Sequence, residues 1–432
     1  MPVLSKLSPE LQKVRIMATR TGLVILLLCG ALPMQAHSAP YALTNSNIFD
    51  GVNDRILENA TVLVADGKIE RIAGAGFPIP ADYEVIDLDG YYLMPGLFDV
   101  HTHLGTLDQA KRALESGVTT VRSASVKAYQ DVALQRLVET GKLAGPEVVA
   151  AGVYVTPDLG DTVLADPRLA ELYDGVNTDD ALRLLVTVNA DRGVRVIKTR
   201  GTQRAGLPDT DPRQQVYTER QLRVVVDEAA RHGLPVMVHA HGDEGARAAV
   251  LAGARSIDHG TYLSDETLQL MKSRGAWMVP TYVTMDEMNE EQYDYVLRLR
   301  GKHMLPPLER AIRAAHGMGV KIATGADNYY TEDSINRISI EVEHFVRMGM
   351  TNFEALQTAT TSSAELLQID DRTGRIEEGF EADLILLPAN PLTNIKALQD
   401  VLMVMSNGQI ALKRIPFGVS SVQLQHRTAE IP

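Results

Sequence analysis

The pattern of hydrophobic and polar positions divides the chain into segments with different predicted structure. Over residues 41–94, short apolar runs are separated by turn sequences such as Asp66-Gly67 and Asp89-Gly90. Runs of this length with such turns are typical of β-strands joined by tight connections. The pattern predicts strands near 41–45, 61–65, 68–72 and 84–88.

After Gly96 the pattern changes to apolar runs that alternate with amphipathic stretches at helical spacing. Eight apolar runs end near His103, Ser125, Thr156, Arg200, His241, Tyr262, Tyr282 and Asn328. Helices are predicted over stretches such as 129–143, 179–191, 218–232 and 264–274. Glycines that can end helices follow at Gly193, Gly233, Gly253, Gly275 and Gly319. Eight strand–helix units over roughly 280 residues predict an α/β fold, a (β/α)8 TIM barrel. A doubly wound parallel sheet is the alternative architecture.

Short strands return after the last helical stretch, 353–367, at 379–387 and 401–408. Strands from the two ends of a barrel can pair with each other. We therefore expect a small β-sandwich domain from residues 40–94 plus 376–415, the barrel over 95–375, and a C-terminal tail over 416–432.

Residues 1–39 carry the features of a secretory signal peptide. A short apolar run from Thr21 is followed by small residues at the end of this segment, and basic residues precede it. The only cysteine, Cys29, lies in the apolar run, so the mature chain is expected to be exported and free of disulfides. Loss of this leader, which carries a charge of +3, takes the net charge from -13 to about -16. Such an acidic chain is expected to bind neither nucleic acid nor an anionic membrane.

Histidine pairs stand where two of the apolar strands end. His101-Thr-His103 follows Leu97-Phe-Asp-Val, and His239-Ala-His241 follows Val236-Met-Val. Alternate side chains on a strand point to the same side, so each pair projects two imidazoles from one face. With 11 histidines in 432 residues, chance predicts only about 0.3 such pairs.

Other strands end in ionisable groups as well. Lys198 and Arg200 close the fourth strand, His259 closes the sixth in Ser256-Ile-Asp-His, and Asp327 closes the eighth in Thr-Gly-Ala-Asp. Functional residues of a barrel gather at the carboxyl ends of its strands. Patterns for nucleotide binding and the serine-hydrolase elbow are missing from the sequence. Together these residues predict a metal site of nitrogen and oxygen ligands.

These motifs resemble the amidohydrolase superfamily over nearly the whole mature chain, and in particular its imidazolonepropionase-like and Xaa-Pro-dipeptidase-like members. The resemblance implies a site for two divalent metal ions, with zinc as the expected metal. By motif, His101, His103 and Asp327 would hold one ion, and His239 and His259 the other. Lys198 would bridge them as N6-carboxylysine, a carbamate.

The same resemblance implies catalysis by a metal-bridged hydroxide, with Asp327 as both ligand and proton shuttle. His241 is assigned to the substrate carbonyl or the developing oxyanion; the exchanged assignment, with His241 as ligand and His239 outside the ligand set, stays open. Arg200 is a candidate clamp for a substrate carboxylate or part of a structural ion pair, and Arg122 has the same two alternatives. An unmodified Lys198 and a helix-capping Asp327 are the remaining alternatives.

The sequence thus predicts a secreted amidohydrolase that cleaves an amide bond and releases a free amino acid from a dipeptide, an N-acyl amino acid or a related aryl amide. The alternatives are hydrolysis of a cyclic amide or lactone, deamination of a heterocycle, and a metal-dependent binding protein without catalysis. The expected partners are a small-molecule amide and further copies of the same chain in a homo-oligomer. The loop 202–217 is expected to form a lid or an oligomer contact.

Overall fold

The computed structural model describes residues 40–334 and 337–414. The predicted signal peptide with Cys29, and the tail 416–432, lie outside the described residues. Among the described helices, none combines the length and the apolar character that crossing a membrane requires.

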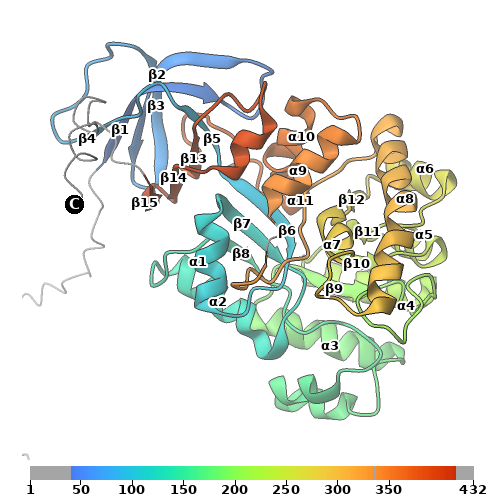
Figure 1. The fold of residues 1–432 in the computed structure, drawn as a ribbon. Coiled ribbons are helices and arrows are strands. Elements are labelled where there is room, and N and C mark those ends of the chain that lie inside the picture. The colour runs from blue at the N-terminus through green and yellow to red at the C-terminus, as the bar shows by residue number, and fades with distance from the viewer. Residues whose placement is uncertain (1–39, 335–336, 415–432) are drawn as a thin grey trace, which may run out of the picture. The chain divides into compact units, whose positions relative to one another are not determined.

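Strands from both ends of the described chain form one mixed sheet (Figure 1). Its order is β15-β14-β13-β5-β1-β2-β3, and β4 pairs with β1. The strands are β1 (Tyr41–Phe49), β2 (Ile56–Ala65), β3 (Lys68–Gly74), β4 (Glu84–Asp87), β5 (Tyr92–Pro95), β13 (Leu384–Leu387), β14 (Met403–Ser406) and β15 (Gln409–Lys413). Asp66 and Gly67 join β2 to β3 with φ values of 50° and 79°, as a tight hairpin turn requires. The predicted pairing of the two ends is therefore present, here as a single sheet.

The middle of the chain forms two parallel sheets. One has the order β6-β7-β8 and the other β12-β11-β10-β9. The strands are β6 (Leu97–Thr102), β7 (Val118–Ser123), β8 (Glu147–Val149), β9 (Ile197–Arg200), β10 (Val236–Ala240), β11 (Ser256–His259) and β12 (Trp277–Val279). These strands are almost entirely buried, as expected for a parallel sheet that is covered on both faces.

Helices follow the parallel strands along the chain (Figure 1). They are α1 (Leu107–Glu115), α2 (Gln130–Glu139), α3 (Asp179–Arg192), α4 (Glu219–Arg231), α5 (Asp243–Ala252), α6 (Asp265–Arg274), α7 (Tyr282–Glu287), α8 (Tyr295–Met318), α9 (Ile338–Arg347), α10 (Asn352–Thr358) and α11 (Thr361–Leu367). Left-handed glycines end four of them, at Gly193, Gly253, Gly275 and Gly319. The helices predicted over 129–143, 179–191, 218–232 and 264–274 are confirmed to within four residues at each end, whereas the predicted stretch 353–367 forms two helices, α10 and α11.

Three of the predicted strands differ from the structure. β8 ends at Val149 rather than near Thr156. β12 ends at Val279 rather than near Tyr282, because Thr281 has a left-handed backbone and α7 follows at once. The expected eighth strand is an irregular segment that runs beside β6, with Asp327 N–H donating to His101 O and His103 N–H donating to Asn328 O. A side chain at Gly325 would lie 2.7 Å from Cβ of His101, so glycine permits this close approach.

Three isolated parallel bridges join the edges of the two sheets. Val155 pairs with Thr199, Met278 with Ile322, and Thr102 with Asn328. Through these bridges the carboxyl ends of β6, β9, β10 and β11 face the same region, where the predicted site residues stand.

Candidate active site

A cavity of about 1130 Å³ opens at the carboxyl ends of the parallel strands. The predicted metal ligands and substrate contacts, unlike Arg122, all belong to its wall: His101, His103, Lys198, Arg200, His239, His241, His259 and Asp327. They come from β6, β9, β10, β11 and the segment after Ile322. Residues at the carboxyl ends of parallel strands are expected to share one site, and these residues do share one cavity. The role of each residue remains a prediction.

β6 delivers two imidazoles toward one carboxylate. His101 Nδ1 lies 2.8 Å from Asp258 Oδ2, and His103 Nδ1 lies 2.7 Å from the carbonyl oxygen of Ser125. Their Nε2 atoms lie 3.3 and 3.0 Å from Oδ1 of Asp327. In each ring, one nitrogen is thus held by the surrounding protein and the other is turned to Asp327.

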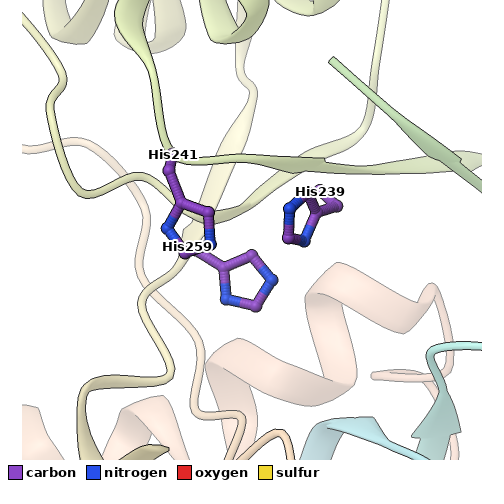
Figure 2. Close-up of side chains that lie close together, drawn as sticks. All are labelled: His239, His241 and His259. Carbon is purple, nitrogen blue, oxygen red and sulfur yellow. The ribbon is translucent and has the colours of Figure 1, made fainter. Parts of the chain in front are cut away.

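A second group of imidazoles, shown in Figure 2, comes from β10 and β11. His239, His241 and His259 turn toward one another, with ring centroids 4.5 to 4.9 Å apart. Here too one nitrogen of each ring has a protein partner. His239 Nε2 lies 3.0 Å from the carbonyl oxygen of Gln203. The Nδ1 atoms of His241 and His259 lie 2.9 and 2.7 Å from threonine hydroxyls.

The histidines of the second group are held in the neutral form that binds metals. Burial, together with the positive charge of neighbouring groups, lowers the pKa of His239 and His259 well below the usual value. Burial also lowers the pKa of His241 to about 3. His239, whose Nε2 donates to a carbonyl oxygen, therefore offers a lone pair on Nδ1. A threonine hydroxyl can donate to or accept from Nδ1 of His241 and His259, so both neutral tautomers fit the geometry of these two rings.

The donor atoms fit divalent metal ions. Potential ligand atoms lie within 4.8 Å of one another in two groups, His239/His241/His259 and His101/His259/Asp327. Ligands about 2 Å from a shared ion lie up to about 4 Å apart, so small shifts would complete either group. Imidazole and carboxylate are ligands that zinc accepts. The geometry places His241 as close to its neighbours as His239, so both assignments of these two residues stay open.

Lys198 lies fully inside this cluster without a hydrogen bond. Its Nζ is buried, makes no hydrogen bond to a described residue, and is 3.6 Å from Asp258 Oδ2. Burial lowers its pKa to about 8, against the attraction of Asp258 and Asp327. Among the described residues, Asp258 is thus its charged partner, and Lys198 lines the same cavity as the histidines.

Asp327 is a site residue and caps no helix. The next described helix, α9, begins at Ile338, and the carboxylate instead faces His101 and His103. Burial alone would raise the pKa of Asp327, but the interactions with these two histidines hold it well below the usual range. Its φ of 47° lies in the left-handed region, which is unfavourable for residues other than glycine. Such strained backbone is often found at functional sites, where surrounding contacts hold it in place.

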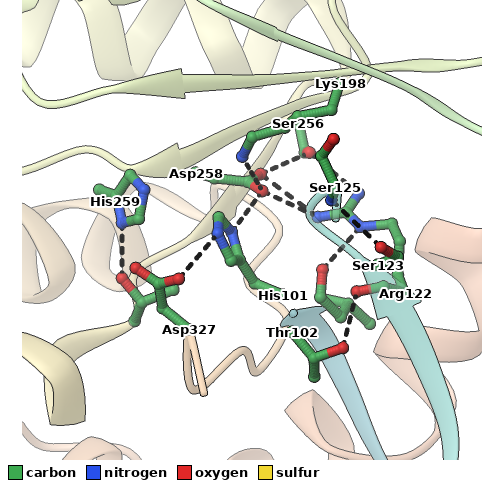
Figure 3. Close-up of polar contacts among 12 residues, drawn as sticks. His101, Thr102, Arg122, Ser123, Ser125, Lys198, Ser256, Asp258, His259 and Asp327 are labelled. Atoms are coloured by element: carbon green, nitrogen blue, oxygen red, sulfur yellow. Dashed lines mark hydrogen bonds and ion pairs between the residues drawn. The ribbon is translucent and has the colours of Figure 1, made fainter. Parts of the chain in front are cut away.

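Asp258 belongs to the polar network behind the cavity and is not among the residues that the sequence predicts. Its carboxylate accepts hydrogen bonds from Arg122 Nη2 and Ser256 Oγ and contacts His101 Nδ1 (Figure 3). Burial alone would raise the pKa of Asp258, but the charges of Arg122 and Lys198 hold it far below the ordinary range. One signal was present: a charged residue in the middle of the buried run Ser256–His259. Arg122 is thereby assigned to a structural ion pair.

Arg200 faces the cavity beside an aromatic ring. Its guanidinium carbon is 4.8 Å from the centre of the Tyr154 ring, and its Nε is buried without a hydrogen bond. No carboxylate in the described part of the chain pairs with it. The alternative of a structural ion pair for Arg200 is therefore not what the structure contains.

Comparison with known proteins agrees with this geometry. The model of the amidohydrolase family matches residues 92–411. The chain is 28% identical over 399 residues to an ochratoxinase of Aspergillus niger, covering 80% of each protein. It is 26% identical over 381 residues to an imidazolonepropionase of Kosmotoga olearia, covering 79% of this chain and 87% of that protein. Among solved structures it resembles a Xaa-Pro dipeptidase with methionine bound in the active site, with a TM-score of 0.76, 27% identity, and coverage of 86% and 99%.

Proposed function

Because the chain belongs to the amidohydrolase family, and is thus a metal-dependent hydrolase of carbon–nitrogen bonds, we propose that it cleaves an amide and releases a free amino acid. The substrate would be a dipeptide, an N-acyl amino acid or a related aryl amide. The observation that carries this proposal is the meeting of six potential metal ligands, His241 and Arg200 in one cavity. The methionine named in the active site of the similar dipeptidase supports an amino acid as product.

The proposal also includes the closure of the parallel sheets into a barrel. The three bridges link the segment after β8 to β9 at Val155, β12 to the segment that starts at Ile322, and that segment to β6. We propose that these bridges close the two parallel sheets into one (β/α)8 barrel. The mixed sheet of the two chain ends is then the accessory domain, whose predicted second layer remains a hypothesis.

The proposed centre holds two divalent ions, with zinc as the expected metal. His101, His103 and Asp327 would hold one ion and His239 and His259 the other, and Lys198, as a carbamate, would supply an anionic ligand that both ions share. Bound ions would lower the pKa of a water and polarise the substrate carbonyl. For the carbamate, the neutral Nζ of Lys198 attacks carbon dioxide, a nitrogen–carbon bond forms, and one proton leaves to solvent. Burial lowers the pKa of Lys198, which favours the neutral amine that this step requires.

The protein side chains then carry out the proton transfers and the binding. Asp327 accepts a proton from the attacking water on a carboxylate oxygen and passes it to the leaving nitrogen. With Nδ1 of His241 held by Thr261, its Nε2 is the nitrogen available to donate to the carbonyl oxygen as charge develops there. Arg200 binds the carboxylate of the amino-acid portion.

Two further proposals rest on sequence alone. The apolar run in residues 1–39 supports export from the cytoplasm, and the family resemblance supports self-association into a homo-oligomer. Both concern features outside the described residues or beyond a single chain.

Turnover assays on the purified protein test the proposed function. We expect release of free amino acid from dipeptides or N-acyl amino acids, loss of this activity with a chelator, and its recovery on adding zinc or manganese. Ring opening or ammonia release, without cleavage of any linear amide, would instead support the cyclic-amide or deaminase alternative.

A further inference from the structure

One arginine fastens part of the loop after β9 to helix α8. Nη1 of Arg300 donates hydrogen bonds to the carbonyl oxygens of Ala205 and Leu207, both at 2.6 Å. Its Nη2 donates to those of Pro208 and Thr210, at 3.1 and 2.6 Å. Hydrogen bonds from a charged donor are stronger than those between neutral groups. A single side chain therefore fixes the path of this backbone.

The fastened segment forms part of the cavity wall. Residues 204–207 line the cavity, and the carbonyl oxygen of the preceding Gln203 lies 3.0 Å from Nε2 of His239. The segment is thus attached at one end to the metal-ligand cluster and along its length to α8. We call residues 203–210 the loop wall.

Arg204 brings a second guanidinium group to the cavity from the loop wall. Its guanidinium carbon is 5.5 Å from the centre of the Tyr154 ring, which Arg200 also approaches. The same Tyr154 ring lies 5.9 Å from Nζ of Lys198. Arg204 therefore faces the same part of the cavity as Arg200 and Lys198.

The positive charge in this part of the cavity has no protein counterpart. Within residues 40–334 and 337–414, neither Arg200 nor Arg204 pairs with a carboxylate. The nearby wall residue Asp158 uses Oδ1 to accept the backbone N–H of Gly160. Nε of Arg200 and Oη of Tyr154 are buried without hydrogen bonds. Guanidinium groups without a partner at a cavity wall are suited to bind a carboxylate.

We propose that Arg204, carried on the loop wall that Arg300 anchors, is a second binding group for the carboxylate of the substrate beside Arg200. Arg204 then determines specificity, and Arg300 is a positioning residue. This inference rests on the proposed function, because it concerns how the same cavity selects substrates that yield a free amino acid.

Binding of an N-benzenesulfonyl amino acid to the metal-loaded enzyme tests this proposal, because its sulfonamide replaces the scissile amide. We expect calorimetry to show that the wild type binds this acid at least tenfold more tightly than its carboxamide. Arg204→Gln should raise the Kd of the acid about tenfold and the Kd of the carboxamide less than twofold, with metal content unchanged. Equal binding of acid and carboxamide by the wild type, or equal effects of Arg204→Gln on both, would overturn the proposal.

Trypsin cleavage after Arg204 in the metal-loaded enzyme tests the anchor. Arg300→Gln should speed this cleavage at least fivefold. It should also raise the Kd of the N-benzenesulfonyl amino acid as Arg204→Gln does. Arg310→Gln is the matched control, since Arg310 lies on the same helix but bonds to Leu263 and Asp265. Unchanged cleavage in Arg300→Gln, or an equal increase in Arg310→Gln, would refute the anchoring role. If no linear amide is hydrolysed although the acid binds as expected, the proposed function fails and the binding inference stands.

Discussion

Replacing Asp327 with asparagine is expected to lower kcat for amide hydrolysis by about 10²–10⁴-fold, the usual contribution of a positioned acid–base group. The amide is nearly isosteric with the carboxylate and keeps an oxygen that can face His101 and His103, which lie 3.3 and 3.0 Å from Oδ1. It cannot take up the proton of the attacking water at neutral pH. Metal content should therefore stay close to that of the wild type while turnover is lost.

Steady-state kinetics and elemental analysis on the same preparations separate these effects. Asp180→Asn is a suitable control, because this carboxylate is 97% exposed in the first turn of α3 and should leave both quantities unchanged. Near-normal turnover in metal-loaded Asp327→Asn would refute the role of Asp327 as proton shuttle.

Replacing Asp258 with alanine is expected to destabilise the metal-free protein by about 3–5 kcal/mol, the usual cost of leaving one member of a buried ion pair without its partner. Arg122 and Asp258 are 2% and 0% exposed and lie 3.2 Å apart. The alanine variant leaves this guanidinium group buried without a carboxylate. It also removes the partner of His101 Nδ1, so we expect weaker metal binding, in the range of 10- to 100-fold.

Urea denaturation of the metal-free protein measures the first effect, and competition with a chelator measures the second. Ser256→Ala is the matched control on β11, because it removes the hydrogen bonds of Ser256 Oγ with Asp258 Oδ1 and Arg122 Nη1 but leaves the ion pair, and it should cost about 2 kcal/mol. If the Asp258→Ala variant proved as stable as Ser256→Ala, the Arg122 charge would not depend on Asp258 as the structure indicates.

The ligand cluster was predictable because its signals are local. Strand alternation places His101 and His103 on one side, and the carboxyl ends of parallel strands meet, so strand-end residues far apart in sequence share one cavity. The helices were predictable for a similar reason. Their apolar spacing and their glycine ends, such as Gly193 and Gly275, are read within a single segment.

What could not be predicted depends on contacts between distant segments. His101 meets Asp258 across 157 positions, and the loop wall is fixed by an arginine 90 or more positions away. Alternation shows which side Asp258 faces, but it does not identify its partners. Helix α8 contains Pro306 and Pro307, which usually interrupt helices, and it is not among the predicted stretches. The segment near Gly325 also depends on a distant contact, because Gly325 lies directly against His101 of β6.

The number of metal ions bound per chain tests the central claim most directly. The purified protein would be saturated with zinc, freed of excess metal by gel filtration, and analysed by plasma mass spectrometry against its protein concentration. We predict two ions per chain, because His101, His103, Lys198, His239, His259 and Asp327 would form one shared centre. A protein that retains no zinc after this loading would contradict the account.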